Sequence, residues 1–283
     1  MSDADPVPVF EGRHLRADLW GAGRARLAVT FDFRRAGRRG FATPPRVAAF
    51  DRAGFAQLSI RSAANDWFIN PETEALEDRL ARLGPRFETV RALGYSMGGY
   101  GAFRLARALG AEAVIAVSPQ ASLAPGVVPF ETRYPEEAAR FSPSLGDLAV
   151  CGGAGLRGLI LLDPAVAEDV AHARLLQGWF PGVRRVALPG GGHPATGLLA
   201  EARMARVLHH LLVSDRPTDP GPILASHKAA RRLSARYWRR LAKRAGTRHP
   251  TLAAKARSLA TRLDGRVPSR TGPERLDGAA ESS

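Results

Sequence analysis

A serine flanked by glycines constrains the fold of this chain more than any other feature. Residues 90–103 read VRALGYSMGGYGAF, in which a short apolar run meets a Gly-x-Ser-x-Gly motif. A helix-forming segment, residues 103–109, follows at once. This order is typical of a strand, a very tight turn and a helix, and a Cβ atom at either flanking glycine would collide with neighbouring backbone. The motif therefore predicts that Ser96 is an exposed nucleophile at the end of a buried strand.

Strand and helix patterns alternate on both sides of this motif. The alternation predicts a mainly parallel sheet with helices on both faces. The expected strands are 26–33, 54–60, 89–93, 113–118, 158–163 and 184–188, and the expected helices are 71–83, 99–109, 169–177 and 198–213.

A serine hydroxyl is a poor nucleophile at neutral pH and needs an adjacent base, which is commonly a histidine. Of the seven histidines, His193 alone follows a late strand in a glycine-rich loop, Pro189-Gly-Gly-Gly-His193. We therefore expect His193 to be the base for Ser96.

The motif at 94–98 and the loop at 189–193 resemble those of the α/β-hydrolase family, whose members commonly carry a Pro-Gly-x-Gly-His turn. The resemblance is at the level of motifs and covers roughly residues 25–212. It implies a doubly wound, mainly parallel sheet in which nucleophile, acid and histidine follow in that order along the chain. We expect this fold to carry a short cap segment and a basic helical C-terminal extension.

The resemblance also implies a carboxylate beside His193, and two aspartates compete for this role. Asp163 ends a predicted strand, and its Asp-Pro-Ala-Val resembles the Asp-Pro-x-Val of many members. Asp169 lies a few residues past the strand end, where the family's acid usually sits, but it is also a good N-cap for the next helix. We favour Asp163 and keep Asp169 as the alternative.

Backbone donors for an oxyanion are expected at Met97, after the nucleophile, and at Phe33, after an early strand. At Phe33 the chain departs from the His-Gly usual in the family. Asn65 and Trp67 end the next strand at the same sheet edge and could line the substrate pocket, although Trp67 would serve equally well as a core aromatic. We expect the arginines of the loop at 34–46 to be solvated.

The remaining segments set the expected domain boundaries. Residues 1–24 are predicted to form a lead-in with an early strand near 13–19, and residues 25–213 the hydrolase domain. The proline-rich excursion at 119–155 is either a small cap or a packed loop. Of the net charge of +14, the region from residue 214 onward contributes most, with 16 Lys and Arg against 6 Asp and Glu. We expect a basic helical hairpin over 214–265 and a disordered tail over 266–283.

These features predict a serine hydrolase that cleaves a carboxylic ester or thioester through an acyl-enzyme, with an acyltransferase as the alternative. A non-catalytic, hydrolase-like adaptor is the alternative from another class. The basic tail could meet an anionic surface or an acidic partner. No cofactor and no metal site are expected. A lone Cys151, the absence of a signal-like N-terminus and the lack of a long apolar run favour a cytoplasmic protein without a membrane span.

Overall fold

The computed structural model describes residues 5–152 and 155–264. The chain divides into two compact units, Met1–Arg232 and Leu233–Ser283. No helix in the described part of the chain is long and apolar enough to cross a membrane.

The first unit is built on one sheet of eight strands in the order β1-β2-β4-β3-β5-β6-β7-β8. β2 runs antiparallel to both of its neighbours, and every pairing from β4 onward in this order is parallel. The strands are β1 Val7–Glu11, β2 Leu15–Trp20, β3 Arg26–Phe31, β4 Phe55–Ser62, β5 Thr89–Tyr95, β6 Ala113–Val117, β7 Arg157–Leu162 and β8 Val183–Ala187. This order and these directions are those of the α/β-hydrolase fold, as predicted.

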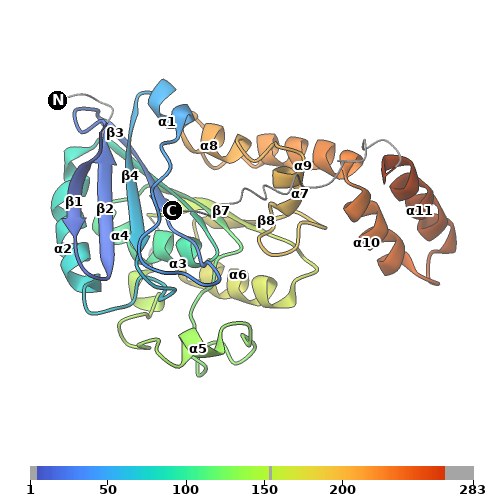
Figure 1. Cartoon of the computed structure of the whole chain (residues 1–283), viewed down its shortest axis with the longest axis horizontal. Helices are drawn as coiled ribbons and strands as arrows, with labels where there is room; N and C mark the ends of the chain where they lie inside the picture. The colour runs from blue at the N-terminus through green and yellow to red at the C-terminus, as the bar shows by residue number, and fades with distance from the viewer. Residues whose placement is uncertain (1–4, 153–154, 265–283) are drawn as a thin grey trace, which may run out of the picture. The chain divides into compact units, whose positions relative to one another are not determined.

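Helices cover both faces of this sheet (Figure 1). One layer holds α1 and α8, which contact each other, and the other holds α2, α3, α4 and α6. The helices are α1 Ala48–Arg52, α2 Thr73–Leu83, α3 Met97–Arg104, α4 Ala106–Leu109, α5 Pro135–Ala138, α6 Ala167–Trp179, α7 Gly197–Glu201, α8 Val207–Leu212 and α9 Gly221–Leu233. All eight residues of β4 and of α3 are buried, so the Gly-x-Ser-x-Gly motif lies in the middle of the core.

The early strand expected near 13–19 is β2, whereas the preceding strand β1 was not expected, so the N-terminal segment is part of the sheet rather than a lead-in. Leu15, Ala17 and Leu19 alternate with more exposed neighbours and point into the core. This period of two is what a sheet with one buried face requires. The single helix expected over 198–213 is instead two short helices, α7 and α8.

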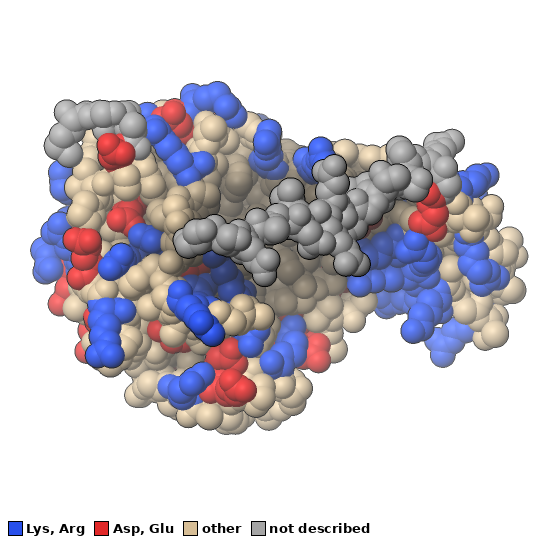
Figure 2. Space-filling model, in the orientation of Figure 1, with Lys and Arg blue, Asp and Glu red and all other residues tan. Residues whose placement is uncertain are grey.

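The C-terminal boundary also differs from the prediction. α9 belongs to the first unit, so that unit ends at Arg232 rather than at Val213. The second unit contains α10 Ala235–Ala245 and α11 Pro250–Asp264, which pack on each other. Figure 2 shows Lys and Arg side chains gathered over these two helices. The tail predicted to be disordered, 266–283, lies outside the described residues.

Candidate active site

Ser96 occupies the turn between β5 and α3 with φ 50° and ψ −118°, a conformation that non-glycine residues rarely adopt. The two flanking glycines make this turn possible. A Cβ at Gly94 would lie 2.0 Å from the carbonyl oxygen of Gly98, and a Cβ at Gly98 would lie 2.5 Å from that of Asp32. Both separations are far inside van der Waals contact, so the spacing of the motif follows from backbone packing.

Ser96, His193 and Asp169 form one continuous hydrogen-bonded chain. The Nε2 atom of His193 lies 3.0 Å from Ser96 Oγ, and its Nδ1 atom lies 3.0 and 2.9 Å from the two carboxylate oxygens of Asp169. The Asp169 side chain is fully buried, whereas that of His193 is 22% exposed. This arrangement allows the imidazole to take a proton from the serine while the carboxylate stabilises the resulting charge.

The preference for Asp163 is therefore wrong as far as the contact with His193 is concerned. Asp163 Oδ2 accepts hydrogen bonds from the backbone N–H groups of Gly190 (3.0 Å) and Gly192 (2.7 Å). Its Oδ1 accepts from the N–H of Ala165 at 3.0 Å. Asp163 thus holds the glycine-rich loop that carries His193 and does not contact the imidazole itself.

Asp169 is not the N-cap of α6, because Val166 holds that position and Asp169 lies in the first turn of the helix. Arg133 donates from Nη1 to Asp169 Oδ1 at 2.8 Å, and the same nitrogen lies 3.4 Å from His193 Nδ1. Burial raises the pKa of Asp169, but the hydrogen bonds and charges of His193 and Arg133 outweigh it and hold the pKa below the usual value. The carboxylate is therefore ionised at neutral pH.

Arg133 is held in turn by a second buried carboxylate, Glu131. The Arg133 guanidinium donates to both Glu131 oxygens, from Nη2 at 2.5 Å and from Nε at 2.9 and 3.1 Å. His172 Nδ1 accepts the backbone N–H of Ala121 at 3.0 Å, which leaves Nε2 to donate to Glu131 at 2.9 Å. Burial raises the pKa of Glu131, yet its partners His172 and Arg133 lower it to about 2. A chain of paired groups thus runs from His172 to Ser96.

Three side chains close around the serine hydroxyl. Ser96 Oγ donates to Gln120 Oε1 at 3.3 Å, and Trp67 Nε1 donates to the same oxygen at 3.1 Å. The hydroxyl of Tyr134 lies 3.3 Å from His193 Nε2, and its ring packs on Trp67 with a centroid distance of 5.0 Å. Trp67 is fully buried and acts both as a core aromatic and as a support for Gln120.

The two predicted oxyanion donors lie in different elements, Met97 at the start of α3 and Phe33 in the loop after β3. Met97 is the first residue of α3, where backbone N–H groups have no partner within the helix. The N–H of Phe33 donates to its neighbour Asp32, Oδ1, at 3.2 Å. The polar atoms of Asn65 bind the loop after β3: Oδ1 accepts from Arg35 N–H (3.1 Å) and Arg38 Nε (2.9 Å), and Nδ2 donates to the Arg35 carbonyl oxygen (2.8 Å).

Arg38 corrects the expectation that the loop arginines are all solvated. Its side chain is 3% exposed and pairs through Nη1 with Asp32 Oδ2 at 2.5 Å. It also donates to the carbonyl oxygens of Ser62 and Phe33. One buried guanidinium therefore ties the start of the loop that carries Phe33 to the C-terminal end of β4.

Sequence reasoning did not identify Gln120, Glu131, Arg133 and Tyr134. All four come from the excursion at 119–155, whose only signal was a break in the strand–helix alternation with prolines and aromatics. The excursion contains the single turn α5 and buries Tyr134 and Phe141. It therefore supplies part of the wall and the electrostatics of the site.

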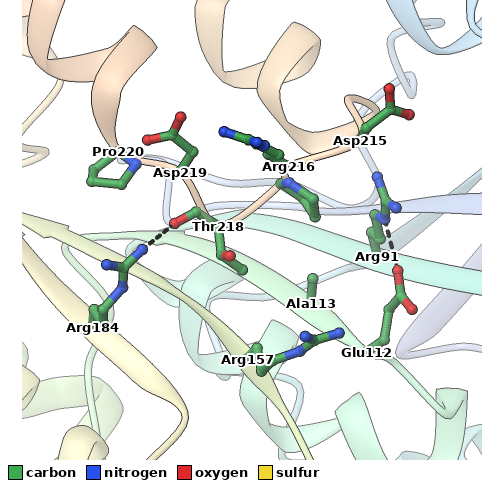
Figure 3. Close-up of a pocket in the computed structure, with 11 residues that line it drawn as sticks. Arg91, Glu112, Ala113, Arg157, Arg184, Asp215, Arg216, Thr218, Asp219 and Pro220 are labelled. Carbon is green, nitrogen blue, oxygen red and sulfur yellow. Dashed lines mark hydrogen bonds and ion pairs between the residues drawn. The ribbon is translucent and has the colours of Figure 1, made fainter.

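A separate hollow of about 560 Å³ lies at the N-terminal ends of the parallel strands, opposite the end that carries Ser96 (Figure 3). Arg91, Arg157 and Arg184 line it from the starts of β5, β7 and β8, together with the segment 215–220. Because Ser96 follows the other end of β5, this hollow is distinct from the candidate active site.

No family model matches the sequence, and no curated protein matches it either. Solved structures do resemble the fold. The capsule O-acetyltransferase of Neisseria meningitidis serogroup A is 17% identical, with 69% of this chain and 90% of that chain covered and a TM-score of 0.47. The Pyrococcus furiosus esterase Pf2001 is 15% identical (74% and 93% covered, TM-score 0.43), and Est1E from Butyrivibrio proteoclasticus is 16% identical (74% and 99%, TM-score 0.44).

Proposed function

We propose that this chain is a serine hydrolase that acts on a carboxylic ester or thioester through an acyl-enzyme. The observation that carries the proposal is the unbroken contact from Ser96 Oγ through His193 to the buried, ionised Asp169. Packing of the β5–α3 turn does not itself require that a serine, a histidine and a buried carboxylate lie in contact. Nucleophilic catalysis does need it.

The proposed reaction has two half-steps. Ser96 Oγ attacks the carbonyl carbon and passes its proton to His193 Nε2, and the imidazolium then protonates the departing alcohol or thiol. Water next attacks the acyl-serine, gives its proton to His193, and the acid leaves as Ser96 recovers that proton. Asp169 stabilises the imidazolium in both half-steps.

The oxyanion of each tetrahedral intermediate needs preorganised donors. Met97 N–H is the first donor in this proposal. The N–H of Phe33 is the second, and it must leave Asp32 to serve. The Tyr134 hydroxyl is a further donor that is already close to the reacting atoms.

The test is covalent labelling together with turnover. A fluorophosphonate should add to Ser96 of the wild-type protein, located by peptide mass spectrometry, and Ser96→Ala should abolish labelling. Turnover of short activated esters should fall by at least about a thousandfold in Ser96→Ala, with binding largely kept. Label on another residue, or a Ser96→Ala protein that retains most of its turnover, would contradict the mechanism. An unlabelled, inactive wild-type protein would favour the adaptor alternative.

An acyltransferase would use the same acyl-enzyme and differ only in the group that captures it. Adding an alcohol to the ester assay separates the two. If the acyltransferase alternative is correct, the transesterified product dominates at an alcohol concentration far below that of water. A hydrolase gives mainly the free acid under the same conditions.

A further inference from the structure

The second unit carries a concentration of positive charge that the proposed chemistry does not use. Its described residues, 233–264, contain nine Lys and Arg and a single carboxylate, Asp264, which pairs with Arg239 at 2.6 Å. The nine are Arg236, Arg239, Arg240, Lys243, Arg244, Arg248, Lys255, Arg257 and Arg262. All but Arg236 are exposed. A net charge of +8 on about two helices attracts a polyanionic partner.

The charge lies on the outer side of the helical pair. In α10 the five cations recur at three- and four-residue steps, which places them on one face. The other face, with Ala242 and Ala245, is buried, as are Ala253, Ala256 and Ala260 of α11. The alanines let the two helices pack closely while the long basic side chains remain outside (Figure 2).

Exposed leucines accompany the cations. Leu252 is 42% exposed and Leu233 is 61% exposed, although most large apolar side chains in the described chain are buried. In α11, Leu252 and the half-buried Leu259 stand seven residues apart, and Lys255 and Arg262 follow them at three-residue offsets on the same side. Leucines flanked by long cationic side chains are the pattern of a helix that lies in a membrane interface.

The same details make a nucleic acid the weaker candidate. Binding to nucleic-acid phosphates requires cations, and exposed leucines do not contribute to it. The two aromatic residues suited to base stacking, Tyr237 and Trp238, are half-buried and pack on each other with a centroid distance of 5.2 Å. The charged face alone would suit either partner, and the leucines favour lipid.

We propose that the helical unit α10–α11 binds the surface of an anionic lipid membrane. The cations meet lipid phosphates, and Leu252 with its neighbours enters the headgroup region without crossing the bilayer. Each Lys or Arg near such a surface strengthens binding about fivefold. The proposal does not depend on the proposed enzymatic activity, because no proposed catalytic group lies in this unit.

Co-sedimentation of the full-length protein with vesicles tests the proposal. The vesicles are phosphatidylcholine alone or phosphatidylcholine with phosphatidylglycerol, in salt from about 0.05 to 0.5 M. The test variant neutralises four exposed cations of the unit, Lys243→Gln, Arg244→Gln, Lys255→Gln and Arg262→Gln. The matched control neutralises four exposed arginines of the first unit, Arg82→Gln, Arg86→Gln, Arg107→Gln and Arg140→Gln.

We expect the wild-type protein and the control to bind only the anionic vesicles, with affinity that falls as salt rises. The test variant should bind at least about tenfold more weakly. The double variant Lys255→Gln/Arg262→Gln should lie between them, which keeps the test sound if the fourfold change disturbs folding. Absence of binding to anionic vesicles at low salt, or equal loss in the control, would overturn the proposal.

Leu252→Ser separates lipid from nucleic acid. It should weaken binding to anionic vesicles several-fold and leave the affinity for a duplex oligonucleotide unchanged, because that affinity rests on charge alone. If the oligonucleotide binds more tightly than the vesicles and Leu252→Ser changes neither, the surface serves nucleic acid and the lipid proposal is wrong.

Discussion

Asp169 contacts His193 and Asp163 contacts the backbone of the loop that carries it, so variants of the two should affect kcat and stability differently. Asp169→Asn removes the charge that stabilises the His193 imidazolium and disturbs its tautomer. We expect kcat for an activated ester to fall by about a thousandfold or more. Loss of the buried pair with Arg133 should also lower the free energy of unfolding. Steady-state kinetics and denaturant unfolding of each variant measure the two effects.

Asp163→Asn serves as the control, since it breaks the contacts to Gly190 and Gly192 but not to His193. It should lower the free energy of unfolding by about 2 kcal/mol, because an amide NH₂ in place of Oδ2 leaves two backbone N–H donors without their acceptor. Its kcat should fall by much less than that of Asp169→Asn. If Asp163→Asn is the more damaging to kcat, the acid assignment is wrong.

Glu131 makes the stability of the site dependent on acid pH. Its pKa falls from 4.5 to about 2 on folding, so the native state is stabilised above pH 4.5 and loses this contribution as the pH falls toward 2. Glu131→Gln should be less stable than wild type at neutral pH, and the difference should close between these values. One proton accounts for a slope of up to about 1.4 kcal/mol per pH unit. Urea titrations across this range measure it, and a constant difference would contradict the assignment.

Single residues could be predicted from the sequence where backbone packing permits only one residue type. Gly94 and Gly98 are sterically required, and the order of Ser96 and His193 follows from the fold. The sequence leaves the acid open between Asp163 and Asp169, because both follow β7 and no residue pattern shows which carboxylate reaches His193. Arg133 lies in an irregular segment, so no helical or strand periodicity in the sequence predicts its position beside Asp169.

The loop between β3 and α1 carries Phe33, the second oxyanion donor of the proposed mechanism. Arg38→Met removes the buried guanidinium and leaves the Asp32 carboxylate, 3% exposed, without its buried partner. We expect the free energy of unfolding to fall by about 3 kcal/mol and kcat/KM to fall with it. Arg39→Met, at an exposed neighbour, should change stability by no more than about 0.5 kcal/mol. Thermal unfolding and ester turnover of the pair provide the test, and equal effects would mean that the loop needs no buried cation.

Element types were predictable from the sequence more reliably than element limits. The parallel strands are apolar runs between turns, and they stand where expected. The region expected as a basic helical hairpin, 214–265, contains three helices, because Ser234 Oγ accepts the backbone N–H of Tyr237 and caps α10. A single serine between two helix-forming segments also occurs inside continuous helices, so the sequence does not reveal this break. β1 was not predicted because it is an edge strand with no fully buried residue and therefore carries a weaker apolar pattern.

At the scale of the whole molecule, the segment after α8 is tied to the sheet. Arg91 donates to the carbonyl oxygens of Leu212 (3.0 Å) and Ser214 (2.6 Å), and Arg184 donates to that of Thr218. In α9, Ile223 is fully buried. His227 Nε2 lies 3.2 Å from the carbonyl oxygen of Pro189, at the start of the loop that carries His193. The boundary at Arg232 therefore has a structural basis that the charge distribution did not reveal.

Two shortened chains test this boundary. A chain that ends at Arg232 keeps Ile223 and the His227 contact to Pro189, so its ester turnover and thermal stability should match those of the full-length protein. A chain that ends at Val213 exposes the apolar surface that Ile223 covers and removes the His227 contact, and the loss of buried apolar side chains of this kind costs several kcal/mol. We expect the shorter chain to be insoluble or to unfold at a lower temperature, with turnover reduced because the His193 loop is released. Expression yield, melting temperature and turnover for both chains decide the matter. If the chain ending at Val213 is as stable and active as the full-length protein, α9 is dispensable and the catalytic unit ends where the positive charge begins.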